Sequence, residues 1–207
     1  MGTTDTPGRR ERKKLETRRA LESAAIALFS EQGFDDTTVE EICDVVDVST
    51  RTFNRYFPRK EDVLFADHEE RVELFRSALA ASDPAAGVLD AIKTATLAVL
   101  REHRRAGDLD LRRALVLAAN PLLQAYNLGR QEDWIEEIAS FVAERLGVDR
   151  HSDPRPELMG RVAIAAIVTA RRRWMKAPDE HELADEYAAV FPLLATGFGV
   201  GAVPAEP

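Results

Sequence analysis

The chain has a single cysteine, Cys43, among its 207 residues. One thiol excludes an internal disulfide and any metal site that needs several cysteines. The four histidines are scattered, and no two have the spacing of a metal-binding pair. The sequence therefore predicts neither a metal nor a cofactor. Cys43 lies on an apolar helical stripe, which indicates a small buried residue rather than a reactive thiol.

Long apolar runs are also missing. The longest nearly unbroken one, residues 162–170, is too short for a membrane-spanning helix, which needs roughly 20 residues. The opening "MGTTDTPGRRERKK" lacks the apolar core of a secretory signal. We expect a cytoplasmic protein without a membrane partner.

Turn clusters of glycine and proline are scarce, as are alternating β-branched residues, whereas alanine, leucine, glutamate and arginine are plentiful. Hydrophobic residues make up 45% of the chain and charged residues 31%, a balance typical of a folded protein. This composition predicts an all-α fold.

The net charge of −8 is unevenly distributed. Residues 1–60 hold 11 basic and 11 acidic residues, whereas residues 61–207 hold 17 and 25. An acidic body with a basic end is expected when that end meets a polyanion. The basic arm, Arg9–Lys14, is thus a candidate for contacting a nucleic-acid backbone, and a merely solvated segment is the alternative.

Three helices are predicted in the first part of the chain. Apolar residues recur at helical spacing over residues 21–29, and Gly33 ends this first helix. Thr38 and Glu41 have the spacing of a capping box, which begins a short second helix. The third helix lies in "VSTRTFNRYFPRKEDVL", where proline ends it before "RKEDVL" opens a fourth.

This third helix has little to bury. Wound at 100° per residue, it turns Phe53 toward the first two helices and polar side chains to the other side. Two short helices joined by a tight turn and braced by a third form a helix-turn-helix, whose second helix reads the DNA major groove. Arginine can fork onto guanine and asparagine onto adenine. The base-contact candidates are therefore Thr50, Arg51 and Asn54, unless this polar face is only solvated.

The stretch "ALESAAIALFSEQGFDDTTVEEICDVVDVSTRTFNRYFPRKEDVL" resembles the N-terminal DNA-binding domain of the TetR family of bacterial transcriptional regulators. The similarity runs without a gap from about Thr17 to Leu64. It implies a homodimer that binds a double-stranded DNA operator and is released by a small-molecule effector, most often as a repressor. Asn54 stands where the family usually has an aromatic residue, so an unusual base preference is expected.

The same resemblance implies which residues hold DNA phosphates. These are Thr38, Ser49, Thr52, Tyr56 and Lys60. Arg55 is a candidate for either a phosphate or a base.

The rest of the chain shows helices without a catalytic motif. Asp83-Pro84 and Asn120-Pro121 each read as an N-cap followed by proline at the first helical position. Gly147 ends a long helix that carries an apolar stripe. No helix carries paired carboxylates beside a histidine, and no phosphate-cradling glycine loop occurs. A helical enzyme, or a ligand carrier without sequence-specific DNA binding, remains the alternative to a non-enzymatic regulator.

The segments "ANPLLQAYNLGRQEDWIEEIASFVAERLGV" and "RRRWMKA" resemble the ligand-binding domains of a TetR subgroup typified by the mycofactocin regulator. That subgroup is described as binding acyl-CoA-like ligands, which implies a pocket for an acyl-CoA or another apolar effector. The candidate walls are Trp134, Ile138, Phe141, Met159 and Ile167. Arg171 is a candidate phosphate contact, although a cation in the last turns of a helix also simply favours its dipole.

A homodimer would place two recognition helices on half-sites about 34–36 Å apart, or a multiple of that. We expect the last two helices to form the dimer interface, as an intersubunit four-helix bundle. Its expected residues are Ala163, Ala166, Ala170, Leu183, Val190, Phe191 and Leu194. The predicted domains are a disordered tail at 1–9, a DNA-binding domain at 10–58, a regulatory and dimerisation domain at 59–199, and a second tail at 200–207.

Overall fold

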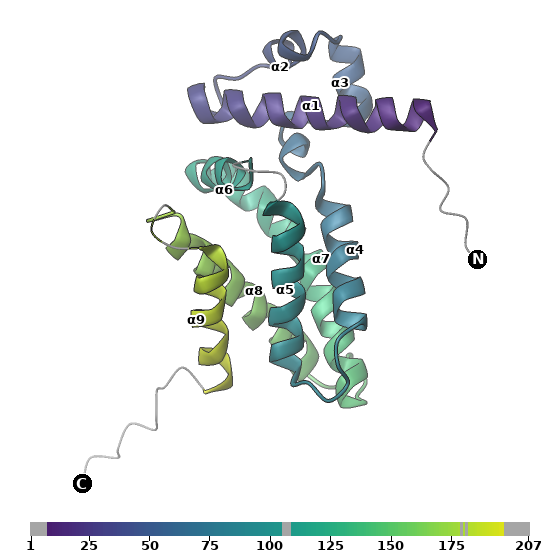
Figure 1. Cartoon of the computed structure of the whole chain (residues 1–207), viewed down its shortest axis with the longest axis vertical. Coiled ribbons are helices and arrows are strands. Elements are labelled where there is room, and N and C mark those ends of the chain that lie inside the picture. The colour runs from purple at the N-terminus through teal and green to yellow at the C-terminus, as the bar shows by residue number, and fades with distance from the viewer. Residues whose placement is uncertain (1–7, 105–108, 179, 181, 197–207) are drawn as a thin grey trace. The chain divides into compact units, whose positions relative to one another are not determined.

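The structure, a computed structural model, describes residues 8–104, 109–178, 180 and 182–196. Every regular element in these ranges is a helix, which confirms the predicted all-α class (Figure 1). In chain order the helices are α1 (Arg9–Gln32), α2 (Val39–Val46), α3 (Thr50–Tyr56), the 3-10 helix η1 (Lys60–Phe65), α4 (His68–Ala80), α5 (Val88–Arg104), α6 (Leu109–Ala119), α7 (Pro121–Leu146), α8 (Arg155–Trp174) and α9 (Leu183–Ala195).

The two expected tails lie outside the described residues, except for Gly8 and Arg9, and Arg9 begins α1. None of the described helices is long and apolar enough to span a membrane.

Contacts divide the chain into two compact units. The first comprises Met1–His68 and Asp108–Gln124, and the second comprises Glu69–Gly107 and Ala125–Pro207. The first unit therefore contains α1, α2, α3, η1 and α6, and the second contains α5, α8, α9 and most of α4 and α7. The boundary expected between residues 58 and 59 does not coincide with this division by contacts. As a division between functions, it stays a prediction.

The first unit has its own hydrophobic core. Phe53 from α3 is completely buried, as the polarity of that helix predicts. Cys43 is also buried there, and burial raises the pKa of its thiol, which confirms an apolar rather than a reactive role. The other large core residues include Leu21, Ile26, Phe29, Phe34, Ile42, Phe57, Val63 and Leu64.

In the second unit, α4, α5, α7, α8 and α9 enclose a separate core. Helices α7 and α8 approach each other closely at Gly160, where an added Cβ would lie 2.8 Å from the Ile135 carbonyl oxygen. Only glycine lets the two backbones come this close. The core residues on α7 and α8 therefore pack directly against one another, in the region where the sequence predicts a ligand pocket.

Two helix starts differ from expectation. The segment "RKEDVL" opens the short 3-10 helix η1 rather than an α-helix, and the Asp62 carboxylate accepts the Arg59 amide (3.0 Å) at its start. After Asp83-Pro84 the chain continues as a turn, and α5 begins only at Val88.

Asp83 does act as a cap, since its side-chain oxygen accepts the Ala85 amide at 2.8 Å. Arg145 holds the turn that follows, because its guanidinium donates to the carbonyls of Pro84 (2.8 Å) and Asp83 (2.9 Å). The cap at Asn120 is confirmed, since its side-chain oxygen accepts the Leu122 amide at 2.9 Å. Gly147, in the left-handed region with φ +63°, ends α7 as predicted.

Candidate nucleic-acid interface

The start of α2 is fixed by a complete capping box. The Glu41 amide donates to the Thr38 hydroxyl (3.2 Å), and the Thr38 amide donates to the Glu41 carboxylate (2.7 Å). These hydrogen bonds, the backbone one first, lower the pKa of Glu41. The Thr38 side chain remains exposed while it caps the helix, so its backbone and hydroxyl are held rigidly at the surface.

A tight turn joins α2 to α3. Asp47 takes a left-handed conformation (φ 54°), which short polar side chains tolerate, and the Val48 amide donates back to the Cys43 carbonyl at 3.1 Å. Ser49 then caps α3, because its hydroxyl accepts the Thr52 amide at 3.2 Å and lies 3.0 Å from the Thr52 hydroxyl. The predicted helix-turn-helix is present.

The two sides of α3 differ as the sequence predicts. Phe53 is 0% exposed and packs on Phe57, with ring centroids 5.4 Å apart. Most of the predicted DNA contacts lie on the rest of the helix: Arg51, Asn54 and Arg55 are exposed, and Thr50, Thr52 and Tyr56 are half-buried. A rigid helix anchored by one aromatic residue thus presents a row of donors and acceptors.

Arg55 is partly held in place by its neighbour. Its guanidinium lies 5.1 Å from the centre of the Tyr56 ring and 3.5 Å from the Tyr56 hydroxyl. A cation over an aromatic face loses some of its freedom to move. Arg55 is therefore presented together with Tyr56 as one surface.

Lys60 has an internal role that the sequence did not reveal. Its ammonium donates to the carbonyls of Phe34 (2.6 Å) and Thr37 (2.7 Å) and lies 4.2 Å from the centre of the Phe34 ring. Lys60 thus ties η1 to the segment between α1 and α2. An ammonium has three donors, so a phosphate contact can be added only as a third interaction.

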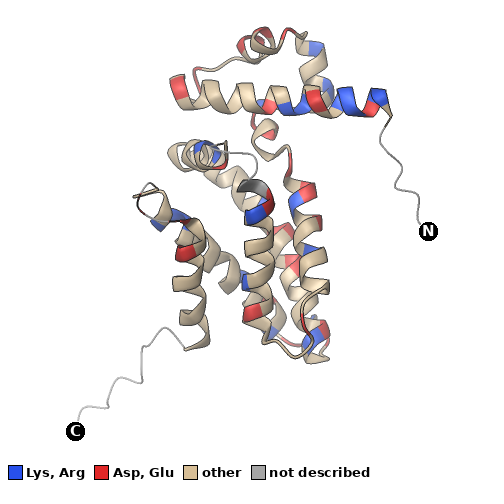
Figure 2. Ribbon diagram, viewed as in Figure 1, with Lys and Arg blue, Asp and Glu red and all other residues tan. Residues whose placement is uncertain are grey.

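The basic arm forms the first turns of α1 rather than an irregular extension. Its side chains from Arg9 to Lys14 are exposed, and basic residues gather at the N-terminal end of this helix (Figure 2). Cations are unfavourable at the positive end of a helix dipole. A nearby polyanion would remove this penalty.

A buried charge cluster lies elsewhere in the same unit. Arg113 on α6 makes an ion pair with Glu22 on α1, and its Nη1 lies 3.0 Å from both carboxylate oxygens of Asp67. Burial raises the pKa of Glu22 to about 7, although Arg113 acts in the opposite direction. No sequence pattern signals this cluster, because its members lie far apart along the chain.

The expected effector residues come together in the second unit. Ile138 and Phe141 belong to its core, and Trp134, Met159 and Ile167 are partly buried against it. Arg171 on α8 is half-buried. The structure therefore groups the five apolar candidates on α7 and α8 as one packed cluster, and their contact with a ligand stays a prediction.

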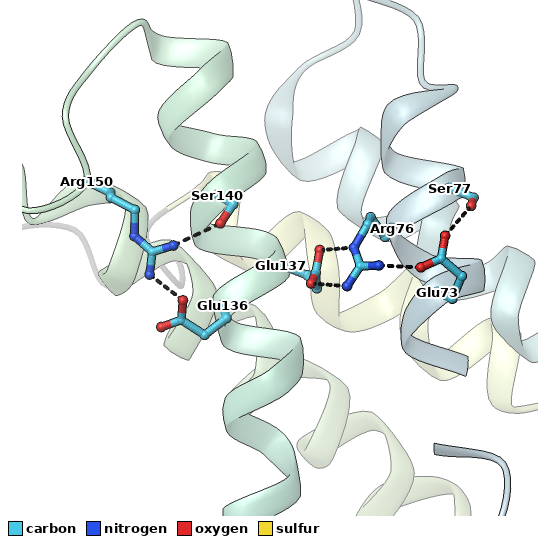
Figure 3. Close-up of polar contacts among 7 residues, drawn as sticks. All are labelled: Glu73, Arg76, Ser77, Glu136, Glu137, Ser140 and Arg150. Atoms are coloured by element: carbon cyan, nitrogen blue, oxygen red, sulfur yellow. Dashed lines mark hydrogen bonds and ion pairs between the residues drawn. The ribbon is translucent and has the colours of Figure 1, made fainter. Parts of the chain in front are cut away.

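Helices α4 and α7 are joined at two levels in this unit. Phe75 packs edge-on against Trp134, with ring centroids 5.2 Å apart. At the surface, the Arg76 guanidinium makes two hydrogen bonds to Glu137, at 2.8 and 2.6 Å (Figure 3).

A charge network surrounds this junction. Arg76 also pairs with Glu73 on its own helix, and Arg150 pairs with Glu136 and Ser140 on α7 (Figure 3). The ionised partners raise the pKa of Arg76, which stays charged. Of these contacts, the Arg76–Glu137 pair joins α4 to α7 beside Trp134.

The expected dimer residues need correction. Six of them are only 0–8% exposed in the single chain, and Leu194 is partly buried against the same core. The side chains of these six pack α8 against α9 and the rest of the unit, so they are not available to a partner, whereas the role of Leu194 stays a prediction. The sequence pattern correctly marked the buried face of each helix. It could not distinguish packing within one chain from an interface between two chains. The six are Ala163, Ala166, Ala170, Leu183, Val190 and Phe191.

A capped, exposed polar helix braced by two others makes this chain a DNA-binding protein of the helix-turn-helix class. The family model "Bacterial regulatory proteins, tetR family" matches residues 21–66, and the model "MftR C-terminal domain" matches residues 86–199. The chain belongs to the TetR family of bacterial transcriptional regulators, with a C-terminal domain of the MftR type.

Similar proteins agree with this assignment. The chain is 34% identical to the HTH-type transcriptional regulator TcmR of Streptomyces glaucescens, over 83% of this chain and 79% of TcmR. It is 26% identical to the putative mycofactocin biosynthesis transcriptional regulator MftR of Mycobacterium tuberculosis, over 90% of this chain and 93% of that protein. Its fold is similar to that of Thermus thermophilus FadR, a repressor solved with lauroyl-CoA, with a TM-score of 0.58, 25% identity and coverage of 92% and 99%.

Proposed function

We propose that this regulator is a repressor that binds a palindromic operator as a homodimer and releases it when an apolar ligand, such as an acyl-CoA, binds its helical body. The observation that carries the DNA-binding half of the proposal is the exposed polar face of α3. Phe53 alone anchors the helix in the core, and Arg51 and Asn54 are exposed on the open face, where they can donate to DNA.

Base reading is assigned to the exposed side chains of Arg51 and Asn54, with Thr50 beside them. They lie three positions apart on one helical face and can address neighbouring base pairs. Phosphate contacts are assigned to the residues around this face, namely Thr38, Ser49, Thr52, Arg55, Tyr56 and, through its remaining donor, Lys60. The basic first turns of α1 add counterion release, which strengthens binding without reading sequence.

The dimer is assigned to the exposed faces of α8 and α9, opposite the faces that pack inside the chain. Leu158 (61% exposed), Ala165 and Thr169 form one stripe at helical spacing on α8. On α9, Ala188 and Leu193 (46% exposed) remain uncovered. Small residues on both helices let a second copy approach closely, and the two-fold symmetry of such a contact matches a palindromic operator.

The effector is assigned to the cluster of Trp134, Ile138, Phe141, Met159 and Ile167. An acyl chain is the proposed ligand because these walls are apolar and because the similar FadR structure holds lauroyl-CoA. Arg171 is half-exposed on the same helix as Met159 and can meet a phosphate of the coenzyme. The ligand must favour one of two packings of the body, and a 100-fold preference corresponds to about 2.7 kcal/mol.

The experiment is a titration of acyl-CoAs of increasing chain length into the complex of the protein with operator DNA. Release should become stronger with chain length and weaker in Trp134→Ala. The matched control is Leu128→Ala, which removes an exposed apolar side chain from the same helix as Trp134. Equal release by free coenzyme A would contradict an acyl-chain pocket, and no release by any acyl species would remove this effector class while leaving DNA binding intact.

A further inference from the structure

The buried cluster around Arg113 holds three separate segments of the first unit together. Arg113 lies on α6, Glu22 lies on α1, and Asp67 lies between η1 and the first residue of α4. Asp110, one turn before Arg113 on α6, is 3.5 Å from the same guanidinium. A single side chain therefore bridges the first helix of the DNA-binding unit, α6 and the entry to α4.

This arrangement is not what stability alone would favour. The side chains of Arg113 and Glu22 are only 7% and 9% exposed, and buried charges lose their hydration. The Arg113 Nε is buried without a hydrogen-bond partner among the described atoms. Well-packed apolar residues commonly replace such clusters at no cost in stability, so stability alone does not account for this one.

The bridged segments are also those that pass between the two units along the chain. Asp67 precedes α4, which continues into the second unit from Glu69. After α6 the chain enters α7, whose residues from Ala125 onward belong to the second unit. There α4 and α7 are joined by the Phe75–Trp134 contact and the Arg76–Glu137 ion pair.

We propose that Arg113 is the positioning residue that couples the DNA-binding unit to α4 and α6, so that events at α3 and in the helical body influence each other. This inference rests on the proposed function. It needs no knowledge of the effector for its test, because coupling between two sites is reciprocal. Operator binding at α3 must therefore affect the body by the same coupling free energy, and Arg113 is the residue proposed to carry it.

The chain contains its own reporter of that change. Its two tryptophans, Trp134 and Trp174, both lie in the second unit, and Trp134 packs against Phe75 on α4. A Trp174→Phe protein would leave Trp134 as the sole emitter. The probe is an operator duplex selected from a random DNA pool, titrated while tryptophan emission and hydrogen exchange of α7 are recorded.

The key variant is Arg113→Lys in the Trp174→Phe background. Lysine keeps the positive charge but, as a point charge, cannot bridge two carboxylates as a planar fork does. We expect the variant to bind operator while losing most of the emission change that the reference protein shows. Arg145→Lys is the matched control: Arg145 donates to Ser82, Asp83 and Pro84 within the second unit, and its substitution should leave the change in place.

Glu22→Gln is the second variant, for use if Arg113→Lys fails to fold. It keeps the shape of the side chain and replaces the ionisable partner of Arg113 with a neutral amide, so it too should reduce the emission change. A full emission change in either folded variant would overturn the inference. Operator binding that alters neither emission nor hydrogen exchange of α7 in the reference protein would also overturn it. Failure of the reference protein to bind any DNA would instead overturn the proposed function, and the inference with it.

Discussion

The ammonium of Lys60 lies 2.6 Å from the carbonyl oxygen of Phe34 and also above the ring of that residue. It thereby joins η1 to the segment between α1 and α2, which precedes the helix-turn-helix. A lysine expected to hold only a phosphate is thus also part of the internal structure.

Replacing Lys60 should therefore lower stability as well as DNA affinity. We expect Lys60→Met, which keeps much of the aliphatic stem, to lower the free energy of unfolding by roughly 1–3 kcal/mol, because hydrogen bonds from a charged donor are lost. Urea unfolding measures this. The control is Arg59→Met at the exposed neighbouring position. Unchanged stability, with a salt slope of DNA binding reduced by about one, would indicate a phosphate contact alone.

Glu22 should make stability depend on pH near neutrality. Its pKa is raised by burial to about 7 from 4.5, with Arg113, Asp67, Arg18 and Asp110 around it. Between these two values the folded chain holds a proton that the unfolded chain has lost, so stability should fall as pH rises from about 4.5 to about 7.

The measurement is the thermal midpoint across this pH range. Glu22→Gln cannot titrate and should lose the decline, whereas Glu157→Gln at an exposed position should retain it. Identical pH profiles in the wild-type chain and Glu22→Gln would show that Glu22 titrates normally.

Gly160 should be irreplaceable in the core of the second unit. Gly160→Ala would place a Cβ 2.8 Å from the Ile135 carbonyl oxygen, so α7 and α8 must move apart. We expect a loss of roughly 1–3 kcal/mol in the free energy of unfolding.

Gly129→Ala is the matched control within α7. An added Cβ there meets nothing within 4 Å, and alanine favours a helix over glycine by roughly 0.5–1 kcal/mol. The two substitutions should therefore shift the urea midpoint in opposite directions. A stabilised Gly160→Ala protein would contradict the close packing of α7 on α8.

Leu193→Glu should separate the proposed dimer without unfolding the chain. Leu193 is 46% exposed on α9, so a charge there is tolerated in one copy but not in an apolar seam. Sedimentation at micromolar concentration should show monomers, whereas Leu128→Glu, at 61% exposure on α7, should remain dimeric. A dimeric Leu193→Glu protein would place the interface elsewhere.

Local patterns in the sequence predicted local structure well. The capping box of Thr38 and Glu41, the cap at Ser49 and the burial of Phe53 all follow from interactions within a few residues, and the structure confirms them. The cap expected at Asp83 also forms, but only a turn follows it, and Arg145 from a distant part of the chain donates to the carbonyls of that turn.

Long-range relationships could not be predicted in the same way. Periodicity marks the apolar face of a helix but not what covers it, so Ala166 and Phe191 looked like dimer residues although the chain buries them itself. The pairing of Arg113 with Glu22 joins α6 to α1, although the two residues lie far apart in the sequence. Only the structure brings such residues together.

Sequence-dependent binding of DNA through α3 is the central claim, and one measurement tests it most directly. The wild-type chain should enrich a palindromic operator from a random duplex pool. Arg51→Ala and Asn54→Ala should each weaken binding to that operator by about 1–3 kcal/mol and relax the preference at one base position per half-site. Arg150→Ala in the second unit should leave affinity unchanged. No enrichment of any sequence, or full affinity and selectivity in both α3 variants, would contradict the account.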